Sequence, residues 1–303
     1  MKKASTSQEL KSFWNNFQFD YTSVMEPNLL SLFILLFNSS KILAPNNNLN
    51  NERLIILEEG CGGGAGLEYI INQLNSRNIE ADIYGTDLSN QMLDHAYDRL
   101  KNCGLINLEY LDSEKHLKIN NNSRINLFLK EADNEKLPFE DFKFDLIIAS
   151  LSLHLVNDPD SMIKESKRVL KNGASAHFSI WGRPENCLPF TIIPNNIKKA
   201  GVVLPEDKRS NFYLSNPVII RDLFFRNEIQ KYKIQSSFIP FNFLKGEDYL
   251  IMTNGSSFIE MMKDLSDEEK ENVRKNIANE LDEKINSEEY FGIEAYLLKF
   301  DKI

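Results

Sequence analysis

The chain has 303 residues, 42% of them hydrophobic, and a formal net charge of −9. This length is long for one α/β domain and short for two large ones, so a single domain with an insertion or a cap is expected. A net acidic chain repels nucleic-acid phosphates unless a basic patch offsets the charge, and here Lys and Arg are scattered among Asp and Glu. The composition disfavours nucleic acid as the main partner and carries no information about small-molecule substrates.

A sparse and odd set of cysteines, Cys61, Cys103 and Cys187, lacks the spacing of a metal site and indicates a reducing compartment. We expect the cytoplasm, with mitochondrial import as the alternative. The chain does not begin with an apolar run typical of a signal peptide, and its most apolar stretch, 29–37, is too short to span a bilayer. No metal site is expected, because the histidines show no ligand spacing. The histidines are His95, His116, His154 and His177.

The first 50 residues predict a helical cap, with helix over 8–39 and an interruption at Pro27. After this cap, short apolar strands alternate with amphipathic helices. We expect strands over 53–59, 81–86, 125–131, 144–151 and 174–181, with helices over 67–76, 90–101 and 160–170. This alternation is typical of a parallel sheet covered on both faces, and ligands bind such sheets at the carboxyl ends of the strands.

The C-terminal part follows a different pattern. A helix over 217–227 and a strand over 231–241 precede a charged, mostly helical stretch over 247–286, and the final strand lies over 290–300. We therefore predict one sheet domain over 51–303, in which 183–215 and 242–288 form cap or insertion segments.

The most informative segment is 58–66, Glu-Glu-Gly-Cys-Gly-Gly-Gly-Ala-Gly, which lies between a predicted strand and a predicted helix. Its glycines allow a sharp turn and a close approach of backbone to ligand, although the pattern alone also fits a dinucleotide fingerprint. Glu58 and Glu59 at the strand end would repel a pyrophosphate. They suit a ligand with a cationic ammonium, such as the methionine part of S-adenosylmethionine (SAM). Asp87 ends the second strand and can accept ribose hydroxyls, a feature that NAD enzymes share.

The segment ILEEGCGGGAG resembles the first motif of the class I SAM-dependent methyltransferases, in which an apolar strand and an acid precede G-x-G-x-G. Glu58 matches the acid, whereas Glu59 stands where an apolar residue is usual and either contacts the ligand or points to solvent. Three further segments match in order, so the resemblance covers roughly 53–182. They are IYGTDLSNQML, EADNEKLPFEDFKFDLIIASLSLHLVNDP and KRVLKNGASAHFSIWG.

The resemblance implies an α/β, doubly wound, Rossmann-like fold with a seven-stranded sheet, mostly parallel with the last strand antiparallel. It implies that Asp87 binds the ribose, that Asp133 accepts from the adenine amino group and that Tyr21 of the cap contacts SAM. The full implied cofactor set is Tyr21, Glu58, Glu59, Gly60, Cys61, Gly62, Gly64, Asp87, Leu88, Met92, Ala132, Asp133, Asn134 and Ser150.

The LPF and L-H-x-V-x-D-P stretches are similar to small-molecule methyltransferases that include the ubiquinone and menaquinone biosynthesis type. Their frequent histidine pair is reduced here to His154, because Leu155 replaces the second histidine. His154 is either a general base or a packed, hydrogen-bonded side chain.

The resemblance implies that an acceptor atom attacks the methyl group of SAM by in-line displacement. This reaction requires the enzyme to align the acceptor with the methyl group and to exclude water, and it requires no metal. We expect the substrate pocket between the strand ends, the N-terminal helices, and the 183–215 and 240–287 segments. The alternatives are a protein or RNA methyltransferase, a catalytically inactive subunit with this fold and, more distantly, a Rossmann dehydrogenase. The oligomeric state stays open.

Overall fold

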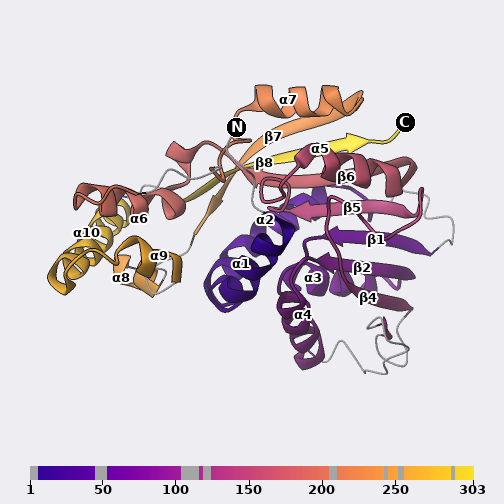
Figure 1. The fold of residues 1–303 in the computed structure, drawn as a ribbon. Coiled ribbons are helices and arrows are strands. Elements are labelled where there is room, and N and C mark those ends of the chain that lie inside the picture. Colours follow the sequence, from indigo (N-terminus) through magenta and orange to yellow (C-terminus); the bar gives the residue numbers. More distant parts are fainter. Residues whose placement is uncertain are drawn as a thin grey trace.

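The computed structural model describes residues 6–44, 53–103, 116–118, 124–204, 210–241, 245–251, 256–287 and 291–303. Figure 1 shows a twisted sheet with helices on both faces and a second group of helices beyond one end of the sheet. The predicted α/β, doubly wound architecture is confirmed.

One eight-stranded sheet runs through the described part of the chain. In spatial order its strands are β3 (His116–Lys118), β4 (Ile125–Glu131), β2 (Ala81–Asp87), β1 (Leu54–Glu59), β5 (Phe144–Ser150), β6 (Leu170–Trp181), β8 (Gly292–Asp301) and β7 (Lys231–Pro240). Strands β4, β2, β1, β5 and β6 are parallel, and β8 is antiparallel to both of its neighbours. Apart from β3, this is the predicted seven-stranded sheet with its antiparallel last strand.

Two details of the sheet differ from the prediction. β3 adds an eighth strand, antiparallel to β4, and its three residues are too few for a hydrophobic period to mark them. The strand predicted over 174–181 begins earlier, because Leu170 already pairs with Phe144 directly after the preceding helix ends. Gly173, with φ of +80°, lies within this first irregular part of β6.

Two layers of helices bury the sheet. α2, α3 and α4 pack on one face, and α5 and α7 pack on the other. Successive side chains of a strand point to opposite faces, so Ile56 joins the first core and Leu57 joins the second. The bounds of these helices are α2 (Glu26–Ser39), α3 (Ala65–Asn75), α4 (Asn90–Asn102), α5 (Pro159–Val169) and α7 (Pro217–Arg226).

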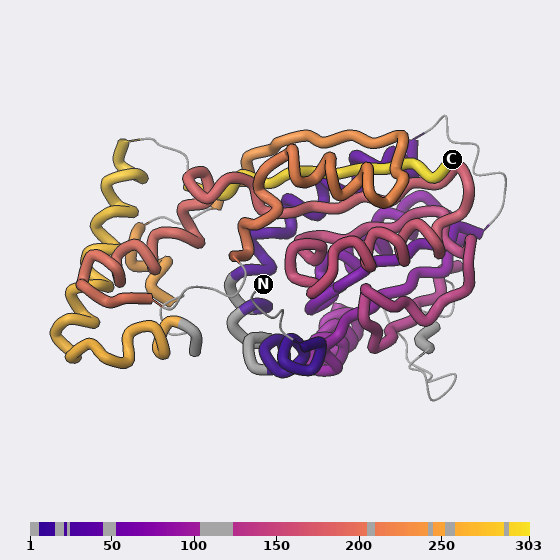
Figure 2. Tube along the Cα trace, turned by 45° about the horizontal axis from the view of Figure 1, so that its top comes forward, coloured from indigo at the N-terminus to yellow at the C-terminus, as the bar shows by residue number. Residues whose placement is uncertain are grey.

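A π-helical turn joins the two N-terminal helices into one continuous helix. α1 (Ser7–Asp20) passes into a π-helical segment (Tyr21–Met25) and then into α2. Pro27 lies in the first turn of α2, directly after the π-helical segment, and the helix continues through it. π-helical turns often occur at functional sites, and this turn carries Tyr21. Figures 1 and 2 show α1 beside α4, near the ends of β1 and β2.

We call α6 (Leu188–Lys199), α8 (Gly246–Tyr249), α9 (Ser256–Met261) and α10 (Asp267–Asn286) the helical lobe. Both views place it beyond the end of the sheet where β1 and β5 finish (Figures 1 and 2). Within it, Asn196 and Lys199 both bind Glu280, at 3.1 and 3.0 Å. The predicted domain boundaries at 50/51, 242 and 288 lie outside the described residues.

Glu294 of β8 ties the base of the lobe to the sheet. Its carboxylate accepts hydrogen bonds from Arg183 Nε at 2.9 Å, Asn186 Nδ2 at 2.9 Å and Ser236 Oγ at 2.9 Å. Arg183 and Asn186 lie directly before α6, so the start of the lobe is fixed to β8, the strand next to the edge strand β7. None of the described helices is long and apolar enough to cross a membrane.

Candidate functional site

The glycine segment forms the connection between β1 and α3. The amides of Gly60 and Cys61 both donate to the Thr86 carbonyl at 2.8 Å, which fixes the turn to the end of β2. Gly60 and Gly62 have φ of +74° and +53°, a region that favours glycine. This turn therefore depends on the glycines, as the sequence pattern predicts.

Asp87 holds the same turn from the end of β2. Its Oδ2 accepts from the Gly62 amide at 2.9 Å, and its Oδ1 accepts from the Ser89 amide at 2.9 Å. Burial nevertheless raises the pKa of Asp87 to about 6, against these amides, which lower it. The Asp87 carboxylate thus lies against the glycine turn, and the hydrogen bonds from the amides offset only part of the cost of burying its charge.

Glu58 is buried next to Asp87. A Cβ on Gly66 would overlap Glu58 Oε1, so the carboxyl group lies directly against the first turn of α3. Its other oxygen, Oε2, has no hydrogen-bond partner among the described residues. Burial, together with the carboxylates of Glu26 and Asp87, raises the pKa of Glu58 well above its usual range.

Arg99 of α4 connects the glycine turn to the N-terminal helices. Its Nε donates to the Gly63 carbonyl at 2.8 Å, and its Nη2 pairs with Glu26 of α2. Within the described residues, no Lys or Arg side chain pairs with Glu58 or Asp87. Glu26 and Glu58, which are buried, and Asp87, which is half-buried, therefore form a group of three carboxyl groups, of which Arg99 compensates one. We call it the acidic cluster.

Tyr21 closes the acidic cluster from the side of the cap. Its Cε1 would lie 3.3 Å from a Cβ on Gly62, and its ring packs edge-on against Trp14 at 5.8 Å. Burial and the charges of Glu26, Asp87 and Glu58 raise the pKa of Tyr21, so its hydroxyl stays protonated. Tyr21, Glu58, Cys61, Gly62 and Asp87, five residues of the predicted set, thus lie together.

α1 also spans the ends of the neighbouring strands. Ser7 Oγ donates to Asp133 Oδ2 at 2.8 Å, Ser89 Oγ donates to Asn15, and Lys11 pairs with Glu131. Because these contacts reach the ends of both β2 and β4, the cap covers the carboxyl edge of this half of the sheet.

A second group of predicted residues surrounds Gly60. The Ala132 amide donates to the Asp87 carbonyl at 3.0 Å, which brings 132–134 to the end of β2. Asn134 Nδ2 and Ser152 Cβ would lie 3.6 and 3.0 Å from a Cβ on Gly60. Asn134 Oδ1 has no hydrogen-bond partner in the described part of the chain. Ser152 was not predicted, and nothing in its sequence context distinguishes it from Ser150.

Four other predicted residues take more peripheral positions. Ser150 Oγ bonds to Ser179 Oγ of β6 at 3.1 Å. Met92 is fully buried in α4, Leu88 lies between Asp87 and the N-cap of that helix, and Gly64 is the N-cap of α3. Of these four, Leu88 touches the acidic cluster through its backbone amide, which bonds to the Asp87 carboxylate.

Glu59 does not lie where the sequence predicts. It is fully buried, so the expectation that it points to solvent is wrong, and its side chain faces α5 rather than the glycine turn. Both of its carboxyl oxygens lie near Ser166 Oγ, at 2.9 and 3.0 Å. The physical reason is the strand period of two: Glu58 and Glu59 point to opposite faces of β1. The predicted ligand contact of Glu59 is not made by this geometry.

Glu59 is instead a neutral acid in the core. Ser166 Oγ also lies 2.9 Å from the Met162 carbonyl, to which it can donate its one proton. The same hydroxyl donates to the Glu59 carboxyl, which accepts, so the serine proton is shared between the two acceptors. Burial raises the pKa of Glu59 to about 8, partly offset by the Ser166 bond, which agrees with a protonated side chain at neutral pH.

His154 lies just beyond the end of β5 and is 3% exposed. Its ring centroid is 5.5 Å from that of Trp181 at the end of β6, and Trp181 lies 4.3 Å from Phe190 of the helical lobe. These three rings form a continuous aromatic wall from the sheet to the lobe. Trp181 and Phe190 carry no motif, so sequence reasoning did not single them out.

The sequence of this region is similar to known enzymes. Residues 57–178 match a protein family described as a methyltransferase domain. A ubiquinone/menaquinone biosynthesis C-methyltransferase of Haemophilus ducreyi is 28% identical over 141 residues, which are 44% of this chain and 46% of that protein. The corresponding protein of Neisseria meningitidis serogroup C is 32% identical over 96 residues, 32% of this chain and 31% of that one. The chain thus spans about half the length, or less, of these curated relatives.

Two solved structures have a similar fold. The [4+2]-cyclase SpnF superposes with a TM-score of 0.56 at 14% identity and covers 99% of this chain and 98% of its own. The phosphoethanolamine N-methyltransferase 2 of Haemonchus contortus, in complex with phosphomonomethylethanolamine and S-adenosylhomocysteine, gives 0.52 at 15% identity, covering 97% of this chain and 60% of its own. At these identities the likeness concerns the fold alone.

Proposed function

We propose that this chain, whose residues 57–178 match a methyltransferase domain family, transfers a methyl group from SAM to a small-molecule acceptor. The observation that carries the proposal is the acidic cluster at the glycine turn. Two buried acids and the half-buried Asp87, with one guanidinium, favour a cationic ligand, and they disfavour the pyrophosphate of a dinucleotide.

The residues present fit SAM. Its ammonium and sulfonium groups are cations, and the unpartnered Oε2 of Glu58 is a buried acceptor that such a cation would satisfy. The glycine turn leaves backbone atoms accessible where a Cβ on Gly62 would crowd Tyr21. Glu58 and the glycine turn would hold the methionine part, Asp87 the ribose, and Asp133 with Asn134 the adenine.

Bound SAM supplies an electrophilic methyl group, so the chain itself needs no nucleophilic residue. Burial and three neighbouring acids raise the pKa of Cys61 well above the usual range for a thiol, which keeps Cys61 in its unreactive form. The protein's contribution is to align the acceptor and to exclude water. α1 excludes water by covering the strand ends through the Ser7–Asp133 and Asn15–Ser89 contacts.

The acceptor would bind between the strand ends, the cap and the lobe segments within 183–215 and 240–287. The aromatic wall of His154, Trp181 and Phe190 supports an apolar or aromatic acceptor, because it runs from the end of β5 to the lobe. His154 would then be the general base or a packed wall residue. Residues 1–50 and the helical lobe act as caps in this proposal, and the unpaired cysteines Cys61, Cys103 and Cys187 suit the cytoplasm.

The fold alone does not fix the chemistry, since one similar structure is a [4+2]-cyclase. The test is methyl transfer from SAM with a labelled methyl group to a cell extract separated into small molecules, protein and RNA. Label in the small-molecule fraction, lost with Asp87→Ala, supports the proposal. Label in protein or RNA would favour those acceptors, and SAM binding without any transfer would favour an inactive subunit.

A further inference from the structure

The outer side of α7 exposes large apolar side chains to solvent. Ile220, Leu223 and Phe224 bury the inner side of this helix in the core over β7 and β8. On the outer side, Phe225 is 81% exposed and Val218 is 64% exposed. Figures 1 and 2 show α7 at the periphery of the molecule. Val218 and Phe225 thus form the two apolar ends of an exposed stripe, which we call the α7 stripe.

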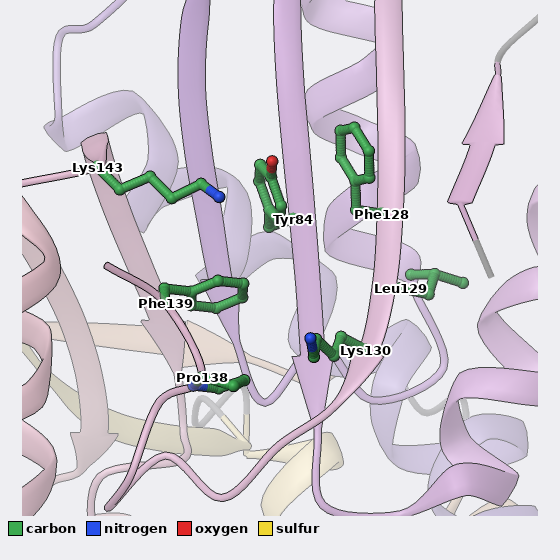
Figure 3. Close-up of a pocket in the computed structure, with 7 residues that line it drawn as sticks. All are labelled: Tyr84, Phe128, Leu129, Lys130, Pro138, Phe139 and Lys143. Atoms are coloured by element: carbon green, nitrogen blue, oxygen red, sulfur yellow. The ribbon is translucent and has the colours of Figure 1, made fainter. Parts of the chain in front are cut away.

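A hollow elsewhere on the same face of the sheet is filled by its own side chains. It lies over β2 and β4 (Figure 3). The ring of Tyr84 stacks on that of Phe128 with the centroids 4.5 Å apart, and Lys143 Nζ lies 4.4 Å from the Tyr84 centroid. Because these groups cover one another, the apolar surface of this hollow is already occupied, unlike that of the α7 stripe.

Hydrogen bonds at both ends hold α7 in place. Asn227 Nδ2 donates to Asp160 Oδ1 of α5 at 2.7 Å, and Arg226 Nη2 donates to Asp160 Oδ2 at 3.0 Å. At the other end, the Asn216 side chain caps the helix by accepting from the Val218 amide at 2.9 Å. The α7 stripe therefore lies on an ordered helix, so a partner that docks there need not pay to fold it.

Two opposite charges lie between the apolar ends of the α7 stripe. They belong to Arg221 and Asp222, which are both exposed. None of the described acids forms an ion pair with Arg221, whereas Asp222 shares the guanidinium of Arg226 with Asp160. Two carboxylates thus have one cation between them. α7 therefore carries one cation and one anion for which a further partner of opposite charge is favourable.

The order of these four residues makes the α7 stripe complementary to itself. Positions i, i+3, i+4 and i+7 share one side of a helix, and the four residues occupy these positions from 218 to 225. If two antiparallel copies of α7 are related by a twofold axis between 221 and 222, Val218 faces Phe225 of the second copy. Arg221 then faces Asp222 of the second copy. The contact has an apolar pair at each end and two ion pairs at its centre.

We propose that two copies of this chain form a homodimer through antiparallel α7 helices. The complementary charges favour a second copy as the occupant, because one stripe supplies both halves of the contact. A pair of short helices buries less area than a permanent dimer needs, so the dimer is weak and depends on concentration. α7 lies on the sheet face opposite α3 and α4, so the contact does not involve the acidic cluster. This proposal does not depend on methyl transfer.

Sedimentation velocity of the full chain, at loading concentrations from about 2 µM to about 500 µM, tests the proposal. Phe225→Asp places a charge at an apolar end of the stripe. Ile259→Asp is the matched control, because Ile259 is also exposed but lies on α9 of the helical lobe. Arg221→Asp and Asp222→Arg reverse the central charges, singly and together. A thermal melt of each variant confirms that it folds.

We expect a monomer at low concentration and a reversible dimer with a dissociation constant on the order of 50 µM. Phe225→Asp and each single charge reversal should weaken the dimer about fivefold or more, because the single reversals bring like charges together. The double reversal should restore most of the affinity, since each ion pair only changes direction, and Ile259→Asp should have no effect.

Three results would each overturn the proposal. The first is a monomer at every concentration. The second is a dimer that Phe225→Asp leaves intact, because this dimer would use another surface. The third is a double reversal that dimerises no better than the single reversals, because the central residues would then not face each other across a twofold axis.

Discussion

Replacing Glu59 by Gln should remove a pH dependence from the stability of the fold. The pKa of Glu59 is raised from 4.5 to about 8, chiefly by burial, so between these pH values the folded protein holds a proton that the unfolded chain has released. The free energy of unfolding therefore falls as pH rises through this window, by about 1.4 kcal/mol per pH unit. From pH 5 to pH 8 the Glu59 contribution amounts to roughly 3 kcal/mol.

Glu59→Gln keeps the shape, and its amide oxygen can still accept from Ser166 Oγ, but it does not titrate. Urea unfolding at pH 5, 6, 7 and 8 should give similar stabilities at pH 5 and a variant more stable than the parent protein by roughly 3 kcal/mol at pH 8. Asp87 also has a raised pKa, about 6, and contributes equally to both proteins.

Glu165→Gln on the neighbouring helix is the matched control. The pKa of Glu165 is lowered, first by its hydrogen bond to Arg168, so its contribution is present at neutral pH and is lost as pH falls. This variant should lose stability at pH 7 and approach the parent at low pH, the opposite sign. Parallel pH profiles for Glu59→Gln and the parent would refute the assignment of Glu59 as a buried neutral acid.

Three further predictions concern the glycine turn. Arg99→Met removes the donor to the Gly63 carbonyl, so KM for SAM should rise about tenfold while kcat changes much less. Steady-state kinetics in which kcat falls and KM is unchanged would exclude this positioning role of Arg99. The affinity for SAM should increase from pH 5.5 to pH 8, because Asp87 and Glu58 bind a cation only when deprotonated, and a pH-independent Kd from calorimetry would contradict this. Gly66→Ala should destabilise the fold by about 2 kcal/mol or more, since the new Cβ overlaps Glu58; an unchanged melting temperature would show that α3 shifts freely.

Much of the fold was predictable because the central strands are buried on both faces. Their continuous apolar runs and the intervening amphipathic helices identify a parallel sheet, and each predicted strand is observed. β3 is too short for any period, and β6 begins within residues that continue the helical pattern of α5. Those differences depend on pairing with β4 and β5, which a local pattern does not contain.

For the site, the sequence located the glycine turn and Asp87 because their order along the chain is itself the signal. It did not predict the role of Glu26 or Arg99, because these two residues are 73 positions apart in the sequence and neither belongs to a motif. The two faces of β1 also separate Glu58 from Glu59 in a way that adjacency in sequence conceals. Tertiary contacts, rather than local residue types, decide which acids belong to the acidic cluster.

The central claim is that the acidic cluster binds SAM. Calorimetric titration of the protein at pH 8 with SAM, with S-adenosylhomocysteine and with NAD tests it most directly, using Glu58→Gln as an isosteric variant that lacks the charge and Glu59→Gln as its neighbour control. The account predicts micromolar binding of SAM, at least tenfold weaker binding by Glu58→Gln, unchanged binding by Glu59→Gln and none of NAD. Equal SAM affinity in Glu58→Gln and the parent protein, or binding of NAD instead, would contradict it.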